Sequence, residues 1–311
     1  MKKNTISVII PAHNEEDVIA KAINSVLKST YKKYEIVVVN NGSTDHTKEV
    51  VEKFIKKYPR RITLLNYEPV SDKELAEKRG AAFSRNRGAE AARGDILFFL
   101  DADDWVREDT LENIAKAFEK YKGVDFIIRN REVVIPDNWR RIFVFNFIIF
   151  KDKIFSSEKN VKEKILTETG HCICAARTKN FKEIGGFDEK YFYSEDNELG
   201  RRLEKMKIKK LISSKVIYYT DMGTTFKDFK RLCKNVAFSR SLDLPEKYSI
   251  NKVLYQTILF VIIFPLFYLS LFMYSYYKCK DLLVSSMTPL LLIIKRILII
   301  YYFIRLKISN F

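Results

Sequence analysis

The sequence predicts an α/β fold in which a mostly parallel, Rossmann-like sheet is flanked by helices. Three observations support this prediction: short apolar runs that end in polar residues, amphipathic stretches between these runs, and a length of 311 residues, which suffices for one large domain. With 47% hydrophobic and 30% charged residues, the composition is that of an ordered chain. Strands that alternate with helices form βαβ units, so most strands are expected to run parallel.

The first hundred residues show the alternation most clearly. Residues 7–10 form an apolar run that ends at Pro11, and Asn14 is suited to cap the helix that follows. Apolar residues between positions 18 and 27 recur at helical spacing. We expect further strands at 36–39, 62–65 and 96–100, and further helices at 50–55 and 73–92.

The pattern is looser from residue 106 to residue 250. We expect a helix at 108–121, a strand at 124–128, and structured segments at 181–187 and 194–203. We therefore divide the predicted catalytic domain into two halves, 1–105 and 106–250. The second half is expected to complete the sheet and to build a second wall of the pocket.

The composition changes at residue 253. Residues 253–277 carry no charge and exceed the roughly 20 residues that cross a bilayer. A second apolar segment, 282–304, is interrupted by Lys295 and Arg296, so it either completes a hairpin, which we favour, or lies in the membrane interface. We expect residues 253–304 to be a membrane anchor of one or two transmembrane helices, and the alternative is a buried core helix.

The net charge of +16 and the pI near 9.5 indicate an anionic partner or surface. Nucleic acid and the cytoplasmic leaflet of a membrane are the candidates. The apolar C-terminal region favours the membrane, and we discount nucleic acid because only the charge supports it. Basic residues next to the anchor place the catalytic domain on the cytoplasmic face. Four cysteines without CxxC spacing do not indicate a disulfide framework.

Two segments keep more than one interpretation. Residues 142–150 form an aromatic run that is either a lipid-facing loop or a buried strand. His171, Cys172 and Cys174 have ligand-forming side chains, but cysteines at alternate positions of an apolar strand more often belong to the core. No second cluster completes four ligands, so we favour the core strand over a metal site.

Polar residues follow the expected strands at the edge of the sheet where α/β proteins bind ligands. Asp101 and Asp103 come directly after strand 96–100, and two carboxylates one residue apart can hold Mg²⁺ or Mn²⁺ with positions left for substrate phosphates. The alternative is a cluster at a helix start in which Asp104 caps the helix near Glu108. Neither GxGxxG nor GxxxxGK[ST] occurs at these strand ends, so a dinucleotide-binding or P-loop site is not indicated.

Six motifs, in order and at the expected spacing, resemble those of family 2 glycosyltransferases, which have the GT-A fold. They are SVIIPAHNEE, EIVVVNNGSTD, SRNRGAEAARGD, FLDADD, IGGFDE and the pair Glu195-Asp196. The resemblance spans about residues 5–205, and the expected anchor lies outside it. It implies an enzyme of the hexosyltransferase class that depends on Mg²⁺ or Mn²⁺ and uses a nucleotide-sugar donor, a UDP- or GDP-sugar.

The resemblance implies that residues 1–105 are the half that binds the nucleotide sugar. His13 would offer a flat surface to the base in place of the commoner Tyr, Arg85 would approach the base or diphosphate, and Asp101 would bind the ribose or uracil side. Asp103 would ligate the metal. The implied donor contacts are Ala12, His13, Glu15, Asn41, Arg85 and Asp101.

The resemblance also implies that residues 106–250 form the acceptor-binding half. Gly185 and Gly186 would allow close backbone approach near the acceptor pocket, with Glu195 beside them. Asp196 matches the general base that takes the proton of an acceptor hydroxyl during a single displacement, which inverts the anomeric configuration. The expected acceptor is a lipid-linked or cell-surface glycan.

The chain departs from the family at Asn40 and Asn41, where two Asp residues are usual. An amide donates as well as accepts hydrogen bonds, so the choice between uridine and guanosine stays open. Two other functions also stay open: a polyprenyl-phosphate glycosyltransferase, whose acceptor is already ionised, and a catalytically silent membrane protein that binds nucleotide sugars. The glycine motif and Glu195-Asp196 favour a hydroxyl acceptor.

Overall fold

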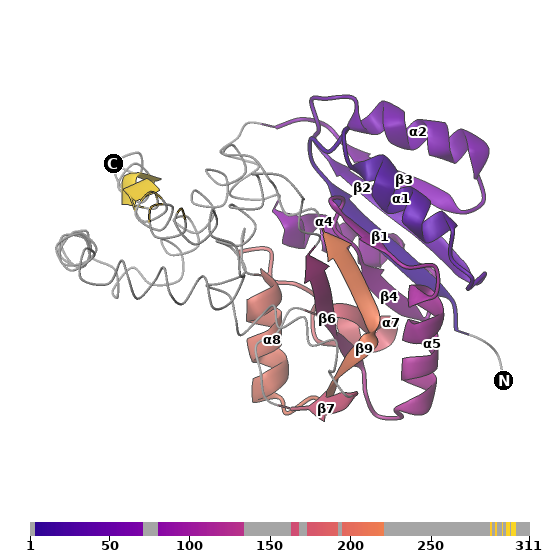
Figure 1. Cartoon of the computed structure of the whole chain (residues 1–311), viewed down its shortest axis with the longest axis vertical. Helices are drawn as coiled ribbons and strands as arrows, with labels where there is room; N and C mark the ends of the chain where they lie inside the picture. The colour runs from indigo at the N-terminus through magenta and orange to yellow at the C-terminus, as the bar shows by residue number, and fades with distance from the viewer. Residues whose placement is uncertain are drawn as a thin grey trace. The chain divides into compact units, whose positions relative to one another are not determined.

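The computed structural model describes residues 4–70, 80–133, 163–167, 173–191 and 195–220, with isolated helical positions between 287 and 302. The chain forms two compact units, one made of Met1–Val133 and Ser157–Thr220, the other of Val134–Ser156 and Asp221–Phe311. The described sheet belongs to the first unit (Figure 1). The aromatic run 142–150, the residues His171 and Cys172, and the apolar segment 253–277 lie outside the described residues.

The first half of the sheet is parallel, as predicted. β1 (Ile6–Ala12) lies between β2 (Tyr34–Asn41) and β4 (Ile96–Phe99), and β3 (Ile62–Tyr67) pairs with the other side of β2. All three pairings are parallel. β2 is buried along its whole length, which explains why its sequence is a continuous Val and Ile run rather than an alternating one. The carboxyl ends of β1, β2 and β4 therefore meet at one edge.

The second half of the sheet is mixed. β8 (Ile173–Arg177) runs antiparallel to both β4 and β6 (Phe126–Val133), whereas β6 is parallel to β9 (Lys210–Thr220). β5 (Asp104–Val106) and β7 (Lys164–Leu166) pair antiparallel with β9. Within the described residues these strands form one nine-stranded sheet. The strand expected near 124–128 is confirmed as β6, and β5, β7 and β9 were not predicted.

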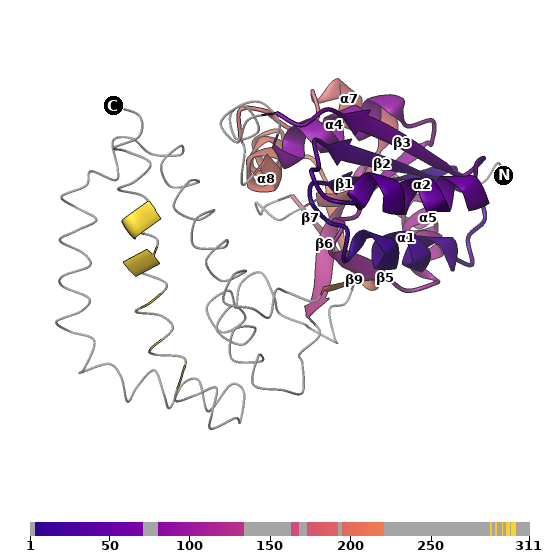
Figure 2. The ribbon, with the colours of Figure 1, turned by 90° about the horizontal axis from the view of Figure 1, so that it is seen from above.

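Helices cover both faces of this sheet, so the unit has three layers (Figure 2). The alternation along β1 explains the two cores: Val8 and Ile10 pack on one face, and Ile9 packs on the other. One face carries α1 (Ile19–Leu27), α2 (Thr47–Lys57) and α5 (Thr110–Lys120), and the other carries α4 (Ala81–Ala91), α7 (Thr178–Glu183) and α8 (Glu195–Lys205). Cys174 is buried in β8, as the core-strand interpretation predicts.

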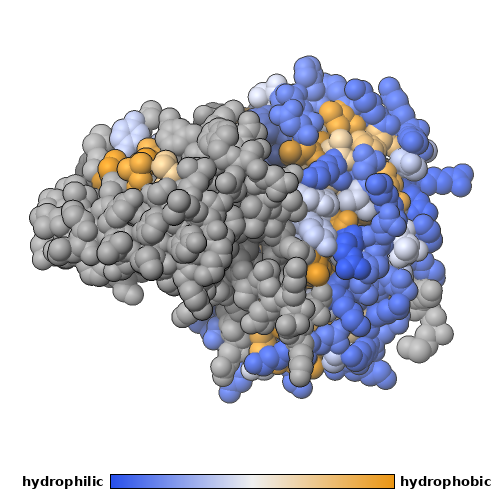
Figure 3. Space-filling model, viewed as in Figure 1, coloured by the Kyte–Doolittle hydropathy of each residue, from blue (hydrophilic) through white to orange (hydrophobic). Residues whose placement is uncertain are grey.

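The described surface of the sheet unit is mostly hydrophilic on the face seen in Figure 3, with apolar side chains in small patches. Among the described residues, no helix combines the length and the apolar character needed to cross a bilayer. The expected anchor, 253–304, falls outside these residues except for the isolated positions from 287 onward.

One local expectation and one alternative were wrong. Asn14 does not cap α1, because the position before this helix is Val18, which makes no side-chain cap. Asn14 instead adopts a left-handed backbone, with φ of +56°, and its side chain accepts a hydrogen bond from the backbone N–H of Thr44 at 2.8 Å; Asn tolerates this conformation better than most residues. Asp104 is not a helix cap either, because it begins strand β5, and α5 starts only after Asp109.

Candidate functional site

The loop after β1 is joined to the end of β2 through His13. Nδ1 of His13 lies 2.8 Å from the backbone oxygen of Asn41, and a carbonyl oxygen only accepts hydrogen bonds. We therefore place the proton on Nδ1, which leaves Nε2 to accept from the side-chain amide of Asn14 at 3.3 Å. The ring of His13 is thus held next to Ala12 and Asn41, two residues expected to contact the donor.

Backbone and side-chain groups link the same two loops along their length. The N–H of Glu15 donates to Oγ1 of Thr47 at 2.8 Å, which places Glu15 at the start of α2. Glu16 and residues of the second loop exchange two bonds, because its N–H donates to Asp45 and its carboxylate accepts from the N–H of His46. Burial opposes ionisation of Asp45, but its hydrogen bonds from Thr47 and Glu16 outweigh burial and lower its pKa. The two loops form one rim at the edge of the sheet.

The side chain of Asn40 is engaged within the protein. Its amide nitrogen donates to Oδ1 of Asn66 on β3 at 2.7 Å, and its oxygen accepts from the hydroxyl of Ser43 at 2.5 Å. Asn41, the last residue of β2, is 4% exposed and lies nearer the rim. The replacement of the usual Asp at position 40 is therefore accommodated by a neighbouring strand.

Three charged side chains from separate elements meet at the end of β4. Nη2 of Arg85, on α4, donates to Oδ1 of Asp101 at 2.6 Å, and Nη1 donates to Oε1 of Glu195 at the start of α8. The side chains of Arg85 and Glu195 are 9% and 8% exposed, and that of Asp101 is 21% exposed. The guanidinium also lies 5.6 Å from the ring centre of Phe187. Three residues that the sequence assigned to two different subsites are thus in direct contact.

Burial is the largest influence on Glu195, and it raises the pKa of this carboxyl. Arg85 lowers the pKa, whereas the negative charges of Asp196 and Asp101 raise it further, and the net direction is upward. Asp196 follows Glu195 in the first turn of α8, and its carboxylate accepts a bond from the N–H of Asn197 at 2.7 Å. Asp196 thus directly follows the residue that Arg85 joins to Asp101.

Asp103 lies on the exposed loop between β4 and β5. Among the residues that the structure describes, no three His, Cys, Asp or Glu side chains gather in a metal site. Mg²⁺ and Mn²⁺ need only one or two protein carboxylates where substrate phosphates and water complete the shell. Asp103 therefore fits a divalent ion that binds together with a diphosphate, because its side chain is exposed at the end of β4.

Gly185 and Gly186 end α7 in left-handed conformations, with φ of +83° and +66°. Asn86, which follows Arg85 on α4, holds the turn through the backbone of Phe187: its amide donates to the Phe187 oxygen at 2.9 Å, and its oxygen accepts from the Phe187 N–H at 3.0 Å. These residues line a groove of about 560 Å³. The expected role of Gly185 and Gly186 in acceptor binding stays a prediction, and the contacts give both glycines a structural role as well.

Sequence reasoning did not assign roles to Asn86 or Arg202. The guanidinium of Arg202 donates to the backbone oxygens of Ile184 and Gly186 at 2.7 and 2.6 Å, so α8 also holds this turn. Both residues lie in or beside motifs that resemble the family. This position in the sequence was the signal that could have marked them as part of the site.

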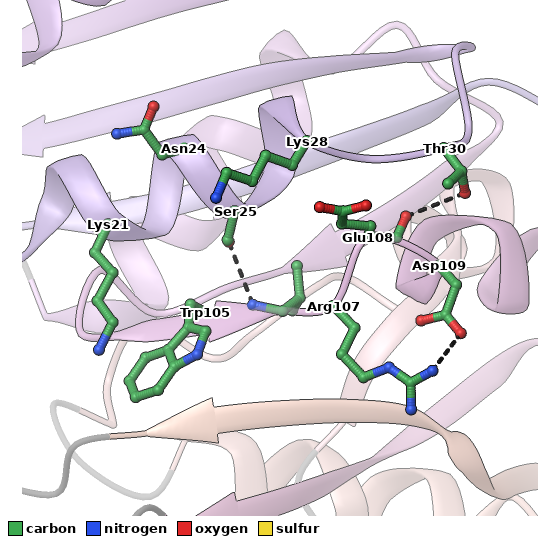
Figure 4. Close-up of a pocket in the computed structure, with 10 residues that line it drawn as sticks. Lys21, Asn24, Ser25, Lys28, Thr30, Trp105, Arg107, Glu108 and Asp109 are labelled. Carbon is green, nitrogen blue, oxygen red and sulfur yellow. Dashed lines mark hydrogen bonds and ion pairs between the residues drawn. The ribbon is translucent and has the colours of Figure 1, made fainter.

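A separate cavity of about 780 Å³ lies between α1 and the segment from β5 to the start of α5 (Figure 4). The ammonium of Lys21 lies 3.1 Å from the ring centre of Trp105, and Arg107 pairs with Asp109 at 2.7 Å. None of the predicted site residues lines this cavity. Its basic side chains are largely engaged within the protein.

Comparison with known sequences supports the motif analysis. The sequence profile of Glycosyl transferase family 2 matches residues 7–185, more than half of the chain. Glycosyltransferase GlyA of Streptococcus pneumoniae is 34% identical over 118 residues, which are 38% of this chain and 16% of GlyA. Glycosyltransferase AglE of Haloferax volcanii is 34% identical over 165 residues, which are 51% of this chain and 50% of AglE. The matches thus span half or less of the length of these relatives.

Comparison with solved structures supports the same fold. Mannosyltransferase PcManGT from Pyrobaculum calidifontis, in complex with GDP-Man and Mn²⁺, gives a TM-score of 0.55 at 20% identity over 78% of this chain and 64% of that chain. TarS 1–349 of S. aureus in complex with UDP gives a TM-score of 0.55 at 19% identity over 96% of this chain and 89% of that chain. At such identities the likeness shows the fold alone, which is the GT-A fold.

Proposed function

The chain belongs to glycosyl transferase family 2, and from this membership we propose that it moves a sugar from a nucleoside-diphosphate sugar to a hydroxyl group of a lipid-linked or cell-surface glycan. The observation that carries the proposal is the contact of Arg85 with both Asp101 and Glu195. This contact joins the strand end expected to bind the donor to the helix that carries the candidate base, Asp196. A transferase needs the departing diphosphate of the donor on one side of the reacting carbon and the base that activates the acceptor on the other side.

The proposed reaction is a single displacement with inversion. The carboxylate of Asp196 accepts the proton of the acceptor hydroxyl as this oxygen attacks the anomeric carbon. The bond from that carbon to the diphosphate breaks on the opposite face, so the products are a glycoside, a nucleoside diphosphate and a proton held on Asp196. A divalent ion at Asp103 supplies, when bound, positive charge that stabilises the leaving diphosphate.

The rim formed by the loops after β1 and β2 is the proposed nucleoside site. His13 presents a planar ring there, and Asn41 lies beside it at the end of β2. Solved relatives hold GDP-Man with Mn²⁺ in one case and UDP-GlcNAc in another. We extend to this chain the use of a UDP- or GDP-sugar with Mg²⁺ or Mn²⁺, and we leave the base open because an amide at position 41 both donates and accepts.

We further propose that residues 253–304 anchor the catalytic unit to the cytoplasmic face of a membrane. The support is in the sequence: residues 253–277 carry no charge, and Lys247, Lys252, Arg305 and Lys307 flank the anchor. Fractionation of cells that express the full chain or residues 1–252 tests this proposal. We expect the full chain in the membrane fraction and the shortened chain in the supernatant, and a full chain in the supernatant would contradict the anchor.

A donor screen tests the proposed transfer. Purified full-length protein in detergent is incubated with Mn²⁺ and a panel of UDP- and GDP-sugars, with and without a glycan acceptor mixture, and free nucleoside diphosphate is measured. We expect release from the sugars of one nucleotide, increased by acceptor and lost in Asp196→Asn. Binding without release would make the protein a silent nucleotide-sugar binder, and release stimulated only by a polyprenyl phosphate would replace the hydroxyl acceptor.

A further inference from the structure

Arg85 joins three elements that lie far apart in the sequence. It projects from α4 and donates to Asp101 at the end of β4 and to Glu195 in the first turn of α8, which is 110 residues away. Its guanidinium has separate terminal nitrogens in one plane, so it can donate to two carboxylates at once, whereas an ammonium is a point charge on a flexible stem. The side chains of Arg85 and Glu195 are more than nine-tenths buried.

Because these charged side chains are buried, the stability of their arrangement depends strongly on each partner. A buried charge is costly unless it is paired and hydrogen-bonded, so loss of one partner leaves the others uncompensated. One guanidinium faces two carboxylates, and Asp196 adds a further negative charge next to Glu195. Without Arg85, the first turn of α8 would carry acidic groups that repel Asp101. The turn would therefore move away from β4.

Both terminal nitrogens of Arg85 face protein carboxylates. These bonds use two of the five N–H donors of the guanidinium and orient it toward β4 and α8, whereas the resemblance implies that Arg85 approaches the base or diphosphate. Glu195 likewise turns inward to Arg85 and is 6% exposed, which leaves little of it for an acceptor sugar. Asp196 is more exposed than Glu195 and shares its helical turn.

We propose that Arg85 and Glu195 are positioning residues that fix Asp196, through the first turn of α8, at a set distance from Asp101 on the donor side. This inference rests on the proposed glycosyl transfer, because the distance matters only if Asp196 and the donor react at one carbon. A misplacement of about 1 Å in such an arrangement can cost about 10²-fold in rate. Neither residue contacts the reacting atoms.

A double-mutant cycle tests the positioning role. Arg85→Met, Glu195→Met and the double variant are prepared in the full chain, and kcat for transfer and Kd for the nucleoside diphosphate are measured. We expect each single variant to lose about 10²-fold in kcat, with the Kd of Glu195→Met near the wild-type value. The double variant should be no worse than the worse single variant, because residues in one network act together.

Other outcomes of the cycle would overturn the inference. If the two losses in kcat multiply, the residues act independently. If Arg85→Met weakens nucleotide binding while Glu195→Met does not, and kcat is unchanged at saturating donor, Arg85 binds the donor directly. Arg87→Met is the matched control, since Arg87 is on the same helix and pairs with the exposed Glu90 and with Glu189. It should keep the wild-type kcat.

Glu195→Gln separates positioning from a chemical role. A Gln side chain keeps the oxygen that accepts from Arg85 and removes a charge that burial disfavours. We expect Glu195→Gln to keep kcat within about tenfold of wild type, since a base typically contributes about 10²–10⁴-fold. A loss as large as that of Glu195→Met would show that the negative charge itself takes part.

The pairing of Arg85 with Glu195, here called the bridge, and the proposed function can fail separately. If wild-type protein transfers no sugar from any donor, the proposed function is wrong. The same cycle measured as free energy of unfolding still tests the bridge, because joined residues give a double variant less destabilised than the sum of the two single variants. Additive destabilisation would overturn the bridge whatever the activity.

Discussion

Gly186 packs directly against Asn86. A Cβ atom at position 186 would lie 2.8 Å from Oδ1 of Asn86, and the backbone of Gly186 has φ of +66°. The neighbouring Gly185 also has a positive φ, +83°, but a Cβ atom there would meet no other atom within 4 Å. Of the two glycines of the IGGFDE motif, Gly186 is therefore the one that lacks space for a Cβ atom.

This difference predicts unequal effects of alanine at the two positions. Gly185→Ala should cost about 1–2 kcal/mol, because its only penalty is the left-handed backbone. Gly186→Ala carries the same penalty and also displaces Asn86 from the Phe187 backbone, which adds roughly 1–3 kcal/mol of overpacking. Urea unfolding of the two variants measures both costs. Equal destabilisation of the two variants would mean that Asn86 can move away from position 186 without a cost in the free energy of unfolding.

A pH-dependent part of the stability is expected from Glu35 on β2. Its carboxylate accepts from the Ser7 hydroxyl at 2.8 Å and from the backbone and guanidinium of Arg93 at 2.7–2.9 Å. Burial raises the pKa of Glu35, but these hydrogen bonds and the Arg93 charge outweigh burial, so the net pKa lies below the ordinary value of 4.5. The unfolded chain thus binds the proton more readily.

The stability from Glu35 should therefore be complete above pH 4.5 and lost as the pH falls through the lowered pKa. Glu35→Gln replaces one acceptor oxygen by an amide that faces donors, and we expect a loss of about 1–3 kcal/mol at neutral pH. Unfolding curves from pH 7 to pH 3 should converge for the variant and the wild type at the acidic end. A constant difference over this range would contradict the assignment.

Metal removal should abolish transfer without unfolding the protein. EDTA and Asp103→Ala are both expected to stop release of nucleoside diphosphate, because the leaving group then lacks its counter-charge. The melting temperature should change little, since Asp103 is exposed. Glu108→Ala, another exposed carboxylate beyond β5, is the control and should transfer normally. Full activity in EDTA would exclude the metal assignment.

Asp196→Asn should keep nucleotide affinity and lose transfer. The amide keeps the shape of the side chain but cannot take the proton of a sugar hydroxyl, and such a base typically contributes about 10²–10⁴-fold. Single-turnover rates and the Kd of the nucleoside diphosphate measure the two effects separately. Glu204→Gln, an exposed acid on the same helix, should behave as wild type. Wild-type transfer by Asp196→Asn would favour an ionised phosphate acceptor.

The fold was predictable where the local pattern is set by burial. The continuous apolar runs of β1 and β2 follow from burial on both faces, and each run ends in the polar residues that form the rim. β5 was missed because three residues are too short for a periodic pattern, and its pairing depends on β9, where Trp105 lies opposite Tyr219. β9 lies after the last family motif.

The candidate site was only partly predictable for a similar reason. The resemblance assigns Arg85 and Asp101 to the donor side and Glu195 to the acceptor side, but the sequence gives no direction for a side chain whose partner is 110 residues away. Arg85 was therefore expected at the donor, and the structure places it between two carboxylates. Asn14 was mistaken for a cap because the bond to Thr44 depends on a loop from another strand.

If the linked rim after β1 and β2 is the nucleoside site that we propose, it also restricts how donor preference can change during evolution or design. Because the His13 ring and the N–H groups of Glu15 and Glu16 all bond to the second loop, an insertion in either loop breaks contacts in both. A transplanted segment must therefore carry residues 12–16 together with residues 40–47. We therefore expect the two stretches to change together, with covariation between them stronger than within either one.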